Sequence, residues 1–391
     1  MVHNYYQSHA PSGEDGVFRE DEKLLRSKGH KITLFTRHND HIMKFSPLKK
    51  ATLMWQVTWS RESYKAIEQL IKLEKPDIVH VCNTFPLISP SIYYACRKYG
   101  IPVVQTVQNY RLFCASGILF RADSVCEECM ALSSIRAIRH GCYRNSRLQT
   151  IPIVIMHNIH KWLDTWTKCV DVYIAATEFS RQKLIQGGLP SERVFVKPNF
   201  FLYMPEPSYN QGNYVVFFGR LSVEKGVRTL LSAWKQLQDV PLKIVGDGVL
   251  REEVISAIKA QNVSSIEFMG FRPHGQCLDL LNQAMFMVMP SEWYEGFPMT
   301  IREAFASGKP VIASRMGAMA EIVSDGKTGL LFEPGNSDDL AEKVRWLAEH
   351  KEIAVQMGKN ARAEFEAKYT AEKNYEILIN IYKMAININS K

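Results

Sequence analysis

Two glutamates in the second half of the chain have the type and spacing needed to bind a polar ligand. Glu295 and Glu303 stand eight residues apart, the first in a loop and the second in the first turns of a helix expected over about 300–307. Two carboxylates near a helix N-terminus suit a ligand that is rich in hydroxyl groups. The same spacing also fits a solvated loop followed by a helix whose dipole favours a glutamate near its start.

Two cations form a second candidate site earlier in the chain. Arg220 and Lys225 follow the apolar run 214–218, which is typical of a buried strand, and they precede a predicted helix. At such a junction the helix amides and the two cations together suit a diphosphate. One arginine and one lysine in a loop are weak evidence by themselves, because loop cations are usually solvated.

The elements around the glutamates predict a β–α–β unit. The apolar run 286–289 reads as a buried strand that ends at Pro290, the helix 300–307 stops before Gly308, and 311–313 forms the next strand. This order is typical of a parallel sheet. Ligands of such sheets bind beyond the carboxyl ends of the strands, where the loop 290–299 is expected.

The segment 290–323, PSEWYEGFPMTIREAFASGKPVIASRMGAMAEIV, resembles the signature segment of the family-4 glycosyltransferases. The E-x7-E motif of that family falls on Glu295 and Glu303. The segment 219–226, GRLSVEKG, resembles the phosphate-binding motif G-R-L-x-x-x-K-G of the same family. The resemblance implies the α/β class and the GT-B fold, in which two Rossmann-like parallel-sheet domains face a central cleft.

The same resemblance implies a retaining enzyme that transfers a hexose from a nucleoside-diphosphate sugar, carried as UDP or GDP. Arg220 and Lys225 would hold the diphosphate, Glu303 the ribose and Glu295 the donor sugar. The catalytic set implied is Glu295, Arg220, Lys225 and Gln108. The donor-binding set implied is Gly13, Gly219, Arg220, Lys225, Gly270, Phe271, Glu295, Gly296, Phe297, Pro298, Met299, Thr300 and Glu303.

No metal ion is expected to take part in the chemistry, because 246–248 reads Gly-Asp-Gly rather than the DxD of metal-dependent donor sites. The acceptor implied is a glycan, a lipid-linked sugar or a small molecule, in the synthesis of cell-surface polysaccharide or glycolipid. An inverting transferase, a phosphorylase or an epimerase with the same fold fits the motifs less well.

The chain departs from the family pattern at two strand ends. Members of this subtype usually read His-Asn at both positions, whereas this chain has Cys82-Asn83 and Gln108-Asn109. Gln108 stands where a histidine is thought to bond the transferred sugar; it can donate and accept hydrogen bonds but cannot carry a proton charge. A non-catalytic or weakly active nucleotide-sugar-binding relative is therefore the alternative.

Four cysteines form the pattern C-x11-C-x2-C-x12-C at Cys114, Cys126, Cys129 and Cys142. The count and the central C-x2-C knuckle fit a structural zinc site, which would order the loop and leave no open position for catalysis. Irregular outer spacings fit a reduced thiol cluster or four half-buried small residues as well.

The length of 391 residues predicts two domains. The first is expected over 1–198 with a Cys-rich insertion at about 110–147, and the second over 214–368. Residues 199–213, which contain Pro205, Pro207 and Gly212, are expected as the linker. The last helix, 369–391, is expected to cross back onto the first domain, as in the family.

Charge is unevenly distributed along the chain. Residues 1–200 hold 27 lysines and arginines against 17 aspartates and glutamates, whereas 201–391 hold 21 against 23. The basic first half suggests an anionic partner, and we expect peripheral contact with an anionic membrane rather than nucleic acid binding. With no signal peptide and no apolar run of spanning length recognised, a cytoplasmic protein at the inner face of the membrane is expected.

Overall fold

The computed structural model describes residues 1–8, 12–131, 133–202, 204–261 and 265–389, and it divides into two compact units. The first unit comprises Met1–Leu119, Cys126–Phe200 and Ala371–Lys391; the second comprises Phe120–Val125 and Phe201–Thr370. The predicted linker residues from 201 onward therefore group with the second unit, although Tyr203 lies outside the described residues.

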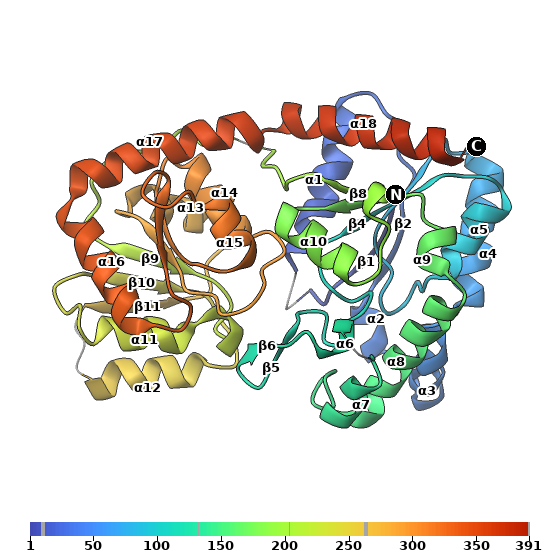
Figure 1. The fold of residues 1–391 in the computed structure, drawn as a ribbon, viewed down its shortest axis with the longest axis horizontal. Helices are drawn as coiled ribbons and strands as arrows, with labels where there is room; N and C mark the ends of the chain where they lie inside the picture. The colour runs from blue at the N-terminus through green and yellow to red at the C-terminus, as the bar shows by residue number, and fades with distance from the viewer. Residues whose placement is uncertain (9–11, 132, 203, 262–264, 390–391) are drawn as a thin grey trace. The chain divides into compact units, whose positions relative to one another are not determined.

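A parallel sheet of six strands forms the centre of the first unit, in the order β2-β1-β3-β4-β7-β8 (Figure 1). Its strands are β1 (Val2–Tyr5), β2 (Phe35–His38), β3 (Val79–Asn83), β4 (Val103–Val107), β7 (Val172–Ala175) and β8 (Val194–Val196). Its helices are α1 (Gly13–Ser27), α2 (Asp40–Met43), α3 (Pro47–Gln56), α4 (Arg61–Glu74), α5 (Ser91–Lys98), α6 (Glu128–Ala131), α7 (Arg136–His140), α8 (Arg147–Trp162), α9 (Thr165–Lys168), α10 (Glu178–Gln186) and α18 (Ala371–Asn389).

The second unit is built on another parallel sheet of six strands, in the order β11-β10-β9-β12-β13-β14. Its strands are β9 (Val215–Phe218), β10 (Leu242–Val245), β11 (Ile266–Gly270), β12 (Met287–Met289), β13 (Val311–Ser314) and β14 (Gly329–Phe332). Its helices are α11 (Val227–Trp234), α12 (Arg251–Gln261), α13 (His274–Gln283), α14 (Met299–Ala306), α15 (Gly317–Ile322), α16 (Ser337–Glu349) and α17 (Lys351–Lys368). A short antiparallel hairpin, β5 (Phe120–Arg121) and β6 (Ser124–Val125), also groups with this unit.

Two boundaries that the sequence predicts in the first unit differ from the structure: the apolar run 32–35 predicts the second strand, and residues 11–16 predict a loop. The second strand, expected at 32–35, runs from Phe35 to His38, because its pairing with β1 begins with Phe35 opposite Val2. The loop expected at 11–16 already contains the start of α1, since Ser12 caps the helix and Asp15 completes a capping box. Pro11 of that loop lies outside the described residues.

Helix α18 packs against the sheet of the first unit through buried polar contacts as well as apolar ones. Lys197 donates to Asp21 at 3.1 Å and to Asn374 of α18 at 3.0 Å, and all three side chains are almost fully buried. His80 on β3 lies between Tyr382 of α18 and Thr106, with 2.7 Å to each hydroxyl. The last helix is therefore an integral part of the first unit. Over the described residues, no helix is long and apolar enough to cross a membrane.

His80 predicts how the stability of the first unit depends on pH. Burial lowers the pKa of His80 to about 3, so the imidazole stays neutral in the folded state while it takes up a proton near pH 6.5 in the unfolded chain. The stability that this residue contributes is complete above pH 6.5. It is lost at about 1.4 kcal/mol per pH unit as the pH falls toward the folded-state pKa.

We expect His80→Gln to flatten the fall of the urea unfolding midpoint between pH 7 and pH 5. Glutamine can bond both hydroxyls but does not titrate. The exposed His41 gives the matched control, because His41→Gln should leave the slope of the wild type unchanged. Equal slopes for His80→Gln and wild type would contradict the assignment.

Candidate functional site

Two loops at the carboxyl ends of neighbouring strands in the second unit are held against each other. Gly226 ends the turn that follows β9 and has φ +67°; a Cβ there would come within 1.8 Å of the carbonyl oxygen of Pro290, at the end of β12. The amide of Glu292 donates to the carbonyl of Glu224 at 2.9 Å. Only glycine permits both the left-handed backbone and the close approach, so it fixes the two loops together.

Glu295 is the acceptor at the centre of these loops. Its Oε1 receives three hydrogen bonds: from Lys225 Nζ at 2.7 Å, from Ser291 Oγ at 2.8 Å and from Trp293 Nε1 at 2.9 Å. The side chain is buried, and Lys225 also lies over the indole ring of Trp293, 5.3 Å from its centroid. The structure therefore brings together Lys225 and Glu295, which are 70 residues apart in the sequence.

Arg220 lies in the same loop after β9 as Lys225. Its guanidinium donates to Glu224 Oε1 at 2.9 Å, and Ser222 Oγ donates to the same oxygen at 2.7 Å. The Arg220 side chain is 61% exposed, so its charge faces solvent rather than the protein core. An anion entering from solvent can reach this guanidinium without any change in the packing of the unit.

Glu303 occupies a different part of the unit from Glu295. It lies on α14 and contacts His274 Nε2 at 3.2 Å, at the start of α13, and Arg302 at 3.6 Å. The sequence suggested two carboxylates converging on one mouth. In the structure Glu295 faces Lys225, whereas Glu303 faces the end of the β11–α13 connection.

The other predicted donor-binding residues lie on the loops that follow β9, β11 and β12 or at the start of α14. Gly270 ends β11 with φ +66° and Phe271 after it is exposed. Phe297 is buried edge-on against Tyr369. The remaining positions are Gly219 directly after β9, Gly296 in the loop, Pro298 as the N-cap of α14, and Met299 and Thr300 in its first turn.

Two predicted site residues belong to the first unit. Gln108 follows β4 and forms a reciprocal amide pair with Asn199, at 2.9 Å and 3.2 Å. Gly13 is the first residue of α1, next to its N-cap Ser12. Their predicted contacts with the donor stay a prediction.

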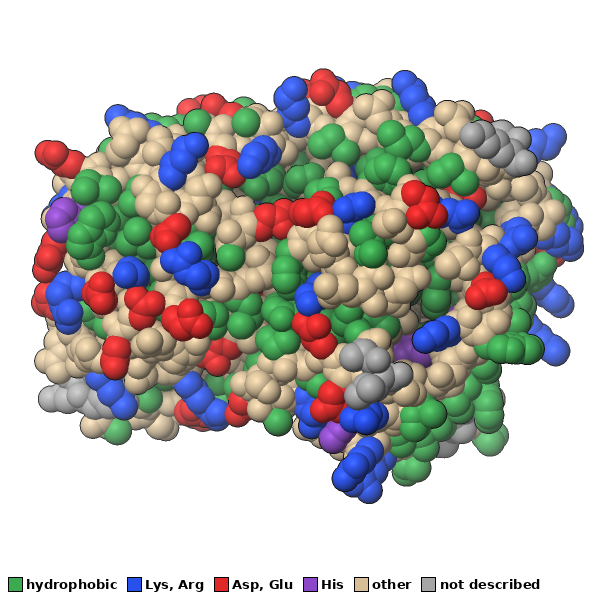
Figure 2. Space-filling view, in the orientation of Figure 1, with side chains coloured by type: hydrophobic (Ala, Val, Ile, Leu, Met, Phe, Trp, Pro, Cys, Tyr) green, Lys and Arg blue, Asp and Glu red, His purple; other side chains and the backbone are tan. Residues whose placement is uncertain are grey.

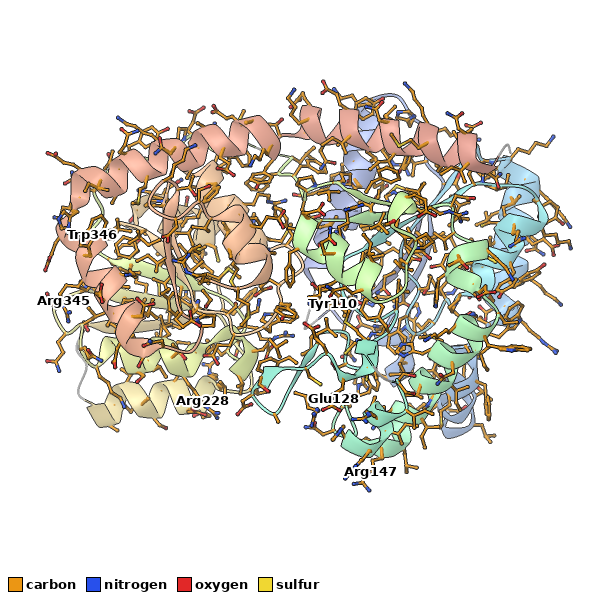
Figure 3. The ribbon with its side chains drawn as sticks, viewed as in Figure 1. Tyr110, Glu128, Arg147, Arg228, Arg345 and Trp346 are labelled. Atoms are coloured by element: carbon orange, nitrogen blue, oxygen red, sulfur yellow. The ribbon has the colours of Figure 1, made fainter. Side chains whose placement is uncertain are left out.

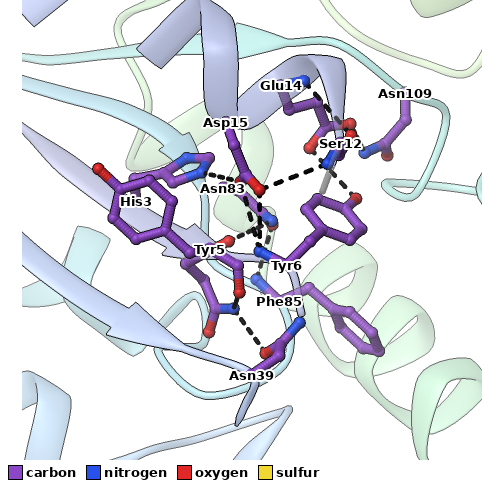
Figure 4. Close-up of polar contacts among 11 residues, drawn as sticks. His3, Tyr5, Tyr6, Ser12, Glu14, Asp15, Asn39, Asn83, Phe85 and Asn109 are labelled. Atoms are coloured by element: carbon purple, nitrogen blue, oxygen red, sulfur yellow. Dashed lines mark hydrogen bonds and ion pairs between the residues drawn. The ribbon is translucent and has the colours of Figure 1, made fainter. Parts of the chain in front are cut away.

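The carboxyl ends of β1, β3 and β4 carry a polar cluster that includes Glu14 (Figure 4). Glu14 accepts hydrogen bonds from Asn109 at 2.5 Å and from the Tyr6 hydroxyl at 3.2 Å. Burial raises the pKa of Glu14, against the opposing effect of the Asn109 hydrogen bond. Asp15 beside it lies 2.7 Å from His3, and this contact fixes the start of α1 against β1.

The four cysteines of the predicted zinc site lie close enough together to influence one another electrostatically. Burial, followed by the charges of Cys114, Cys142 and Cys126, raises the pKa of Cys129 to about 12. Yet among the described residues no group of three or more His, Cys, Asp or Glu side chains is arranged to hold a metal ion. The structure gives the zinc hypothesis no support.

Sequence reasoning missed several residues that shape the site. Ser291 and Trp293 flank Glu295 within four positions, and their polar side chains next to the motif were a usable signal. Glu224 lies within the predicted phosphate motif itself. His274 carries no local signal, because only the fold places it at Glu303.

Because Glu295 is buried, we expect Lys225 and Arg220 to contribute unequally to the free energy of unfolding. Lys225→Met would leave a buried carboxylate without its counter-ion, which costs about 3 kcal/mol of the free energy of unfolding. Arg220→Ala removes an exposed pair and should cost less than about 1 kcal/mol. Urea unfolding of the two variants measures the difference, and equal losses would show that the Lys225–Glu295 pair is not stabilising.

Comparison with known proteins matches the two units separately. Residues 204–364 match the family "Glycosyl transferases group 1", and residues 22–201 match "Glycosyltransferase Family 4". An uncharacterized glycosyltransferase of Methanocaldococcus jannaschii, MJ1178, is 38% identical over 167 residues, which are 42% of this chain and 47% of the relative. The D-rhamnosyltransferase WbpZ of Pseudomonas aeruginosa is 33% identical over 160 residues, 40% of this chain and 42% of the relative. The match thus spans less than half the length of each of these curated relatives.

A solved structure is similar over nearly the whole chain. Alr3699/HepE of Anabaena, in complex with UDP and glucose, matches with a TM-score of 0.65 over 97% of this chain and 98% of that one. At 19% identity this likeness bears on the fold alone. Together with the two family matches it confirms the fold class and the family expected from the motifs. The chain therefore belongs to the group 1 glycosyltransferases of family 4 and has the GT-B fold.

Proposed function

We propose that the protein is an active glycosyltransferase that moves a hexose from a nucleoside-diphosphate sugar to a hydroxyl acceptor, with retention of configuration. The observation that carries the proposal is the pair of cations, Arg220 and Lys225, held at a strand-to-helix junction beside the buried Glu295. Family membership supports the transfer reaction, and the E-x7-E motif supports retention.

In the proposed mechanism Arg220 and Lys225 bind the diphosphate. The bond between the anomeric carbon and the diphosphate oxygen breaks, a bond from that carbon to the acceptor oxygen forms, and the proton of the acceptor hydroxyl passes to the departing diphosphate. Negative charge grows on the departing diphosphate, and two fixed cations stabilise that charge without a divalent ion. The contacts of Arg220 with Glu224 and of Lys225 with Glu295 hold both cations in place before the donor arrives.

Glu295 and Glu303 are proposed to bind hydroxyl groups at the two ends of the donor. One oxygen of Glu295 already accepts three hydrogen bonds from the protein, so its second oxygen would accept from the sugar. Glu303, which contacts His274 at the start of α13, would accept from the ribose. We favour UDP over GDP because the similar Anabaena structure contains UDP and glucose.

The acceptor is proposed to be a sugar hydroxyl in cell-surface polysaccharide or glycolipid synthesis. The support is one relative named as a D-rhamnosyltransferase, together with the motifs. The non-catalytic alternative, which rested on Cys82 and Gln108, is not favoured by the comparisons. Cys82 lies 3.8 Å from the buried His80, and burial raises the pKa of its thiol, which fits a packing role.

Arg220→Ala tests the proposal directly, because the exposed side chain can be removed without disturbing the fold. We expect kcat to fall by about 10²–10³-fold and UDP to lose most of its stabilising effect on thermal unfolding. Arg228→Ala is the matched control: Arg228 lies on α11 (Figure 3), its side chain is also exposed, and its guanidinium pairs with Glu253 of α12 at 2.7 Å.

Transfer to a purified acceptor and thermal shifts with UDP and with GDP are the measurements. Unchanged transfer by Arg220→Ala would overturn the proposed role of the cation. Retention is tested separately from the anomeric proton coupling of the product by NMR. A product of inverted configuration would contradict the assignment to a retaining reaction.

A further inference from the structure

Helix α3 in the first unit lacks the buried face that normally stabilises a short helix. It runs from Pro47 to Gln56, and among the side chains of α3 that the structure describes none is buried. Leu48 is 82% exposed and Trp55 69%, and Met54 between them is also exposed. A helix of ten residues is marginal in water unless one face is covered, so this one needs an apolar partner surface.

Helix α8, against which α3 packs, is apolar on two faces. One face carries Ile153, Val154 and Met156 and is buried in the core of the unit. The outward face carries a second apolar stripe at helical spacing, half-buried in the middle and exposed at its ends: Leu148, Ile151, Ile155, Ile159 and Trp162. Leu148 is 73% exposed and Trp162 82%. A helix with two apolar faces is stabilised when both of those faces are covered.

The chain around these two helices is strongly basic. Residues 41–60 and 129–163 contain no aspartate or glutamate but eight cations: Lys44, Lys49, Lys50, Arg136, Arg139, Arg144, Arg147 and Lys161. Figure 2 shows hydrophobic side chains gathered over α3 and α8 at the lower right, with lysine and arginine side chains beside them. Arg147, at the first turn of α8, projects outward from the ribbon (Figure 3).

We propose that α3 and the outward face of α8 form a surface that binds the headgroup region of a bilayer containing anionic lipids. Exposed tryptophan and leucine would enter the boundary between headgroups and acyl chains, and the cations would contact lipid phosphates. The surface lies on the membrane rather than across it, because no helix described here could span a bilayer. This inference goes beyond the proposed function and does not depend on it.

Charge favours a lipid surface over a second copy of the chain as the partner. Two copies joined through this face would bring together two pairs of segments, 41–60 and 129–163, which contain cations but no carboxylate. Like charges across an interface oppose association, whereas an anionic bilayer neutralises them.

Vesicle co-sedimentation tests the proposal without any substrate, so its outcome is separate from that of the transferase assay. We expect the wild type to bind vesicles of phosphatidylcholine with about 30 mol% phosphatidylglycerol far better than vesicles of phosphatidylcholine alone. Leu48→Ser/Trp55→Ser should weaken binding by about tenfold or more, and Lys49→Gln/Lys50→Gln should do so at low salt. Because these side chains are exposed, the variants should unfold at the wild-type urea concentration.

Two double variants serve as controls, one for the loss of two exposed apolar side chains and one for the loss of two exposed lysines. Leu73→Ser/Trp346→Ser removes an exposed leucine on α4 and a partly exposed tryptophan on α16, and Lys235→Gln/Lys259→Gln removes two exposed lysines of the second unit. Both should bind vesicles like the wild type. Equal binding by the α3 variants and these controls would overturn the proposal. So would a dimer without vesicles, in analytical ultracentrifugation, that Leu48→Ser/Trp55→Ser converts to a monomer.

Discussion

The contact between Lys225 and Glu295 is the interaction on which the candidate site depends. It joins the loop after β9 to the loop after β12, and it places a cation next to a buried carboxylate in a part of the unit where both would otherwise be costly to bury. Gly226 makes the contact geometrically accessible, because any side chain there would collide with Pro290. A ligand that binds Lys225 therefore meets a preorganised group rather than a mobile lysine.

The parallel sheets explain why residues distant in sequence meet. In each six-stranded sheet the strands are parallel, so their carboxyl ends lie on one edge and the loops that follow them share one surface of the sheet. Arg220 follows β9 and Glu295 follows β12, its direct neighbour in the sheet. In the first unit the same rule gathers Glu14, Asn109 and Tyr6 at one edge, although no motif connected them.

Much of the fold followed from the sequence, because a buried parallel strand is a short apolar run and its helix is periodic. The β–α–β unit around Pro290 matches the structure within two residues at each end. The start of α1 was missed although its capping signal, Ser12 with Asp15, is present in the sequence. Contacts such as Glu303 with His274 could not be predicted, because they depend on how α13 packs, and a single sequence carries no trace of that packing.

The structure also changes the meaning of the positive charge in the first half of the chain. As a property of residues 1–200 it suggested an anionic partner without a location. The acid-free segments 41–60 and 129–163 hold eight of the 27 cations, and the other 145 residues of that half hold 19 cations against 17 acids and are nearly neutral. The excess positive charge is thus local, and α3 and α8, which lie in these two segments, expose large apolar side chains.

A surface that only kept the protein soluble would not combine charge with exposed tryptophan, since apolar exposure opposes solubility. The combination is accounted for by a partner that is anionic at its surface and apolar beneath it.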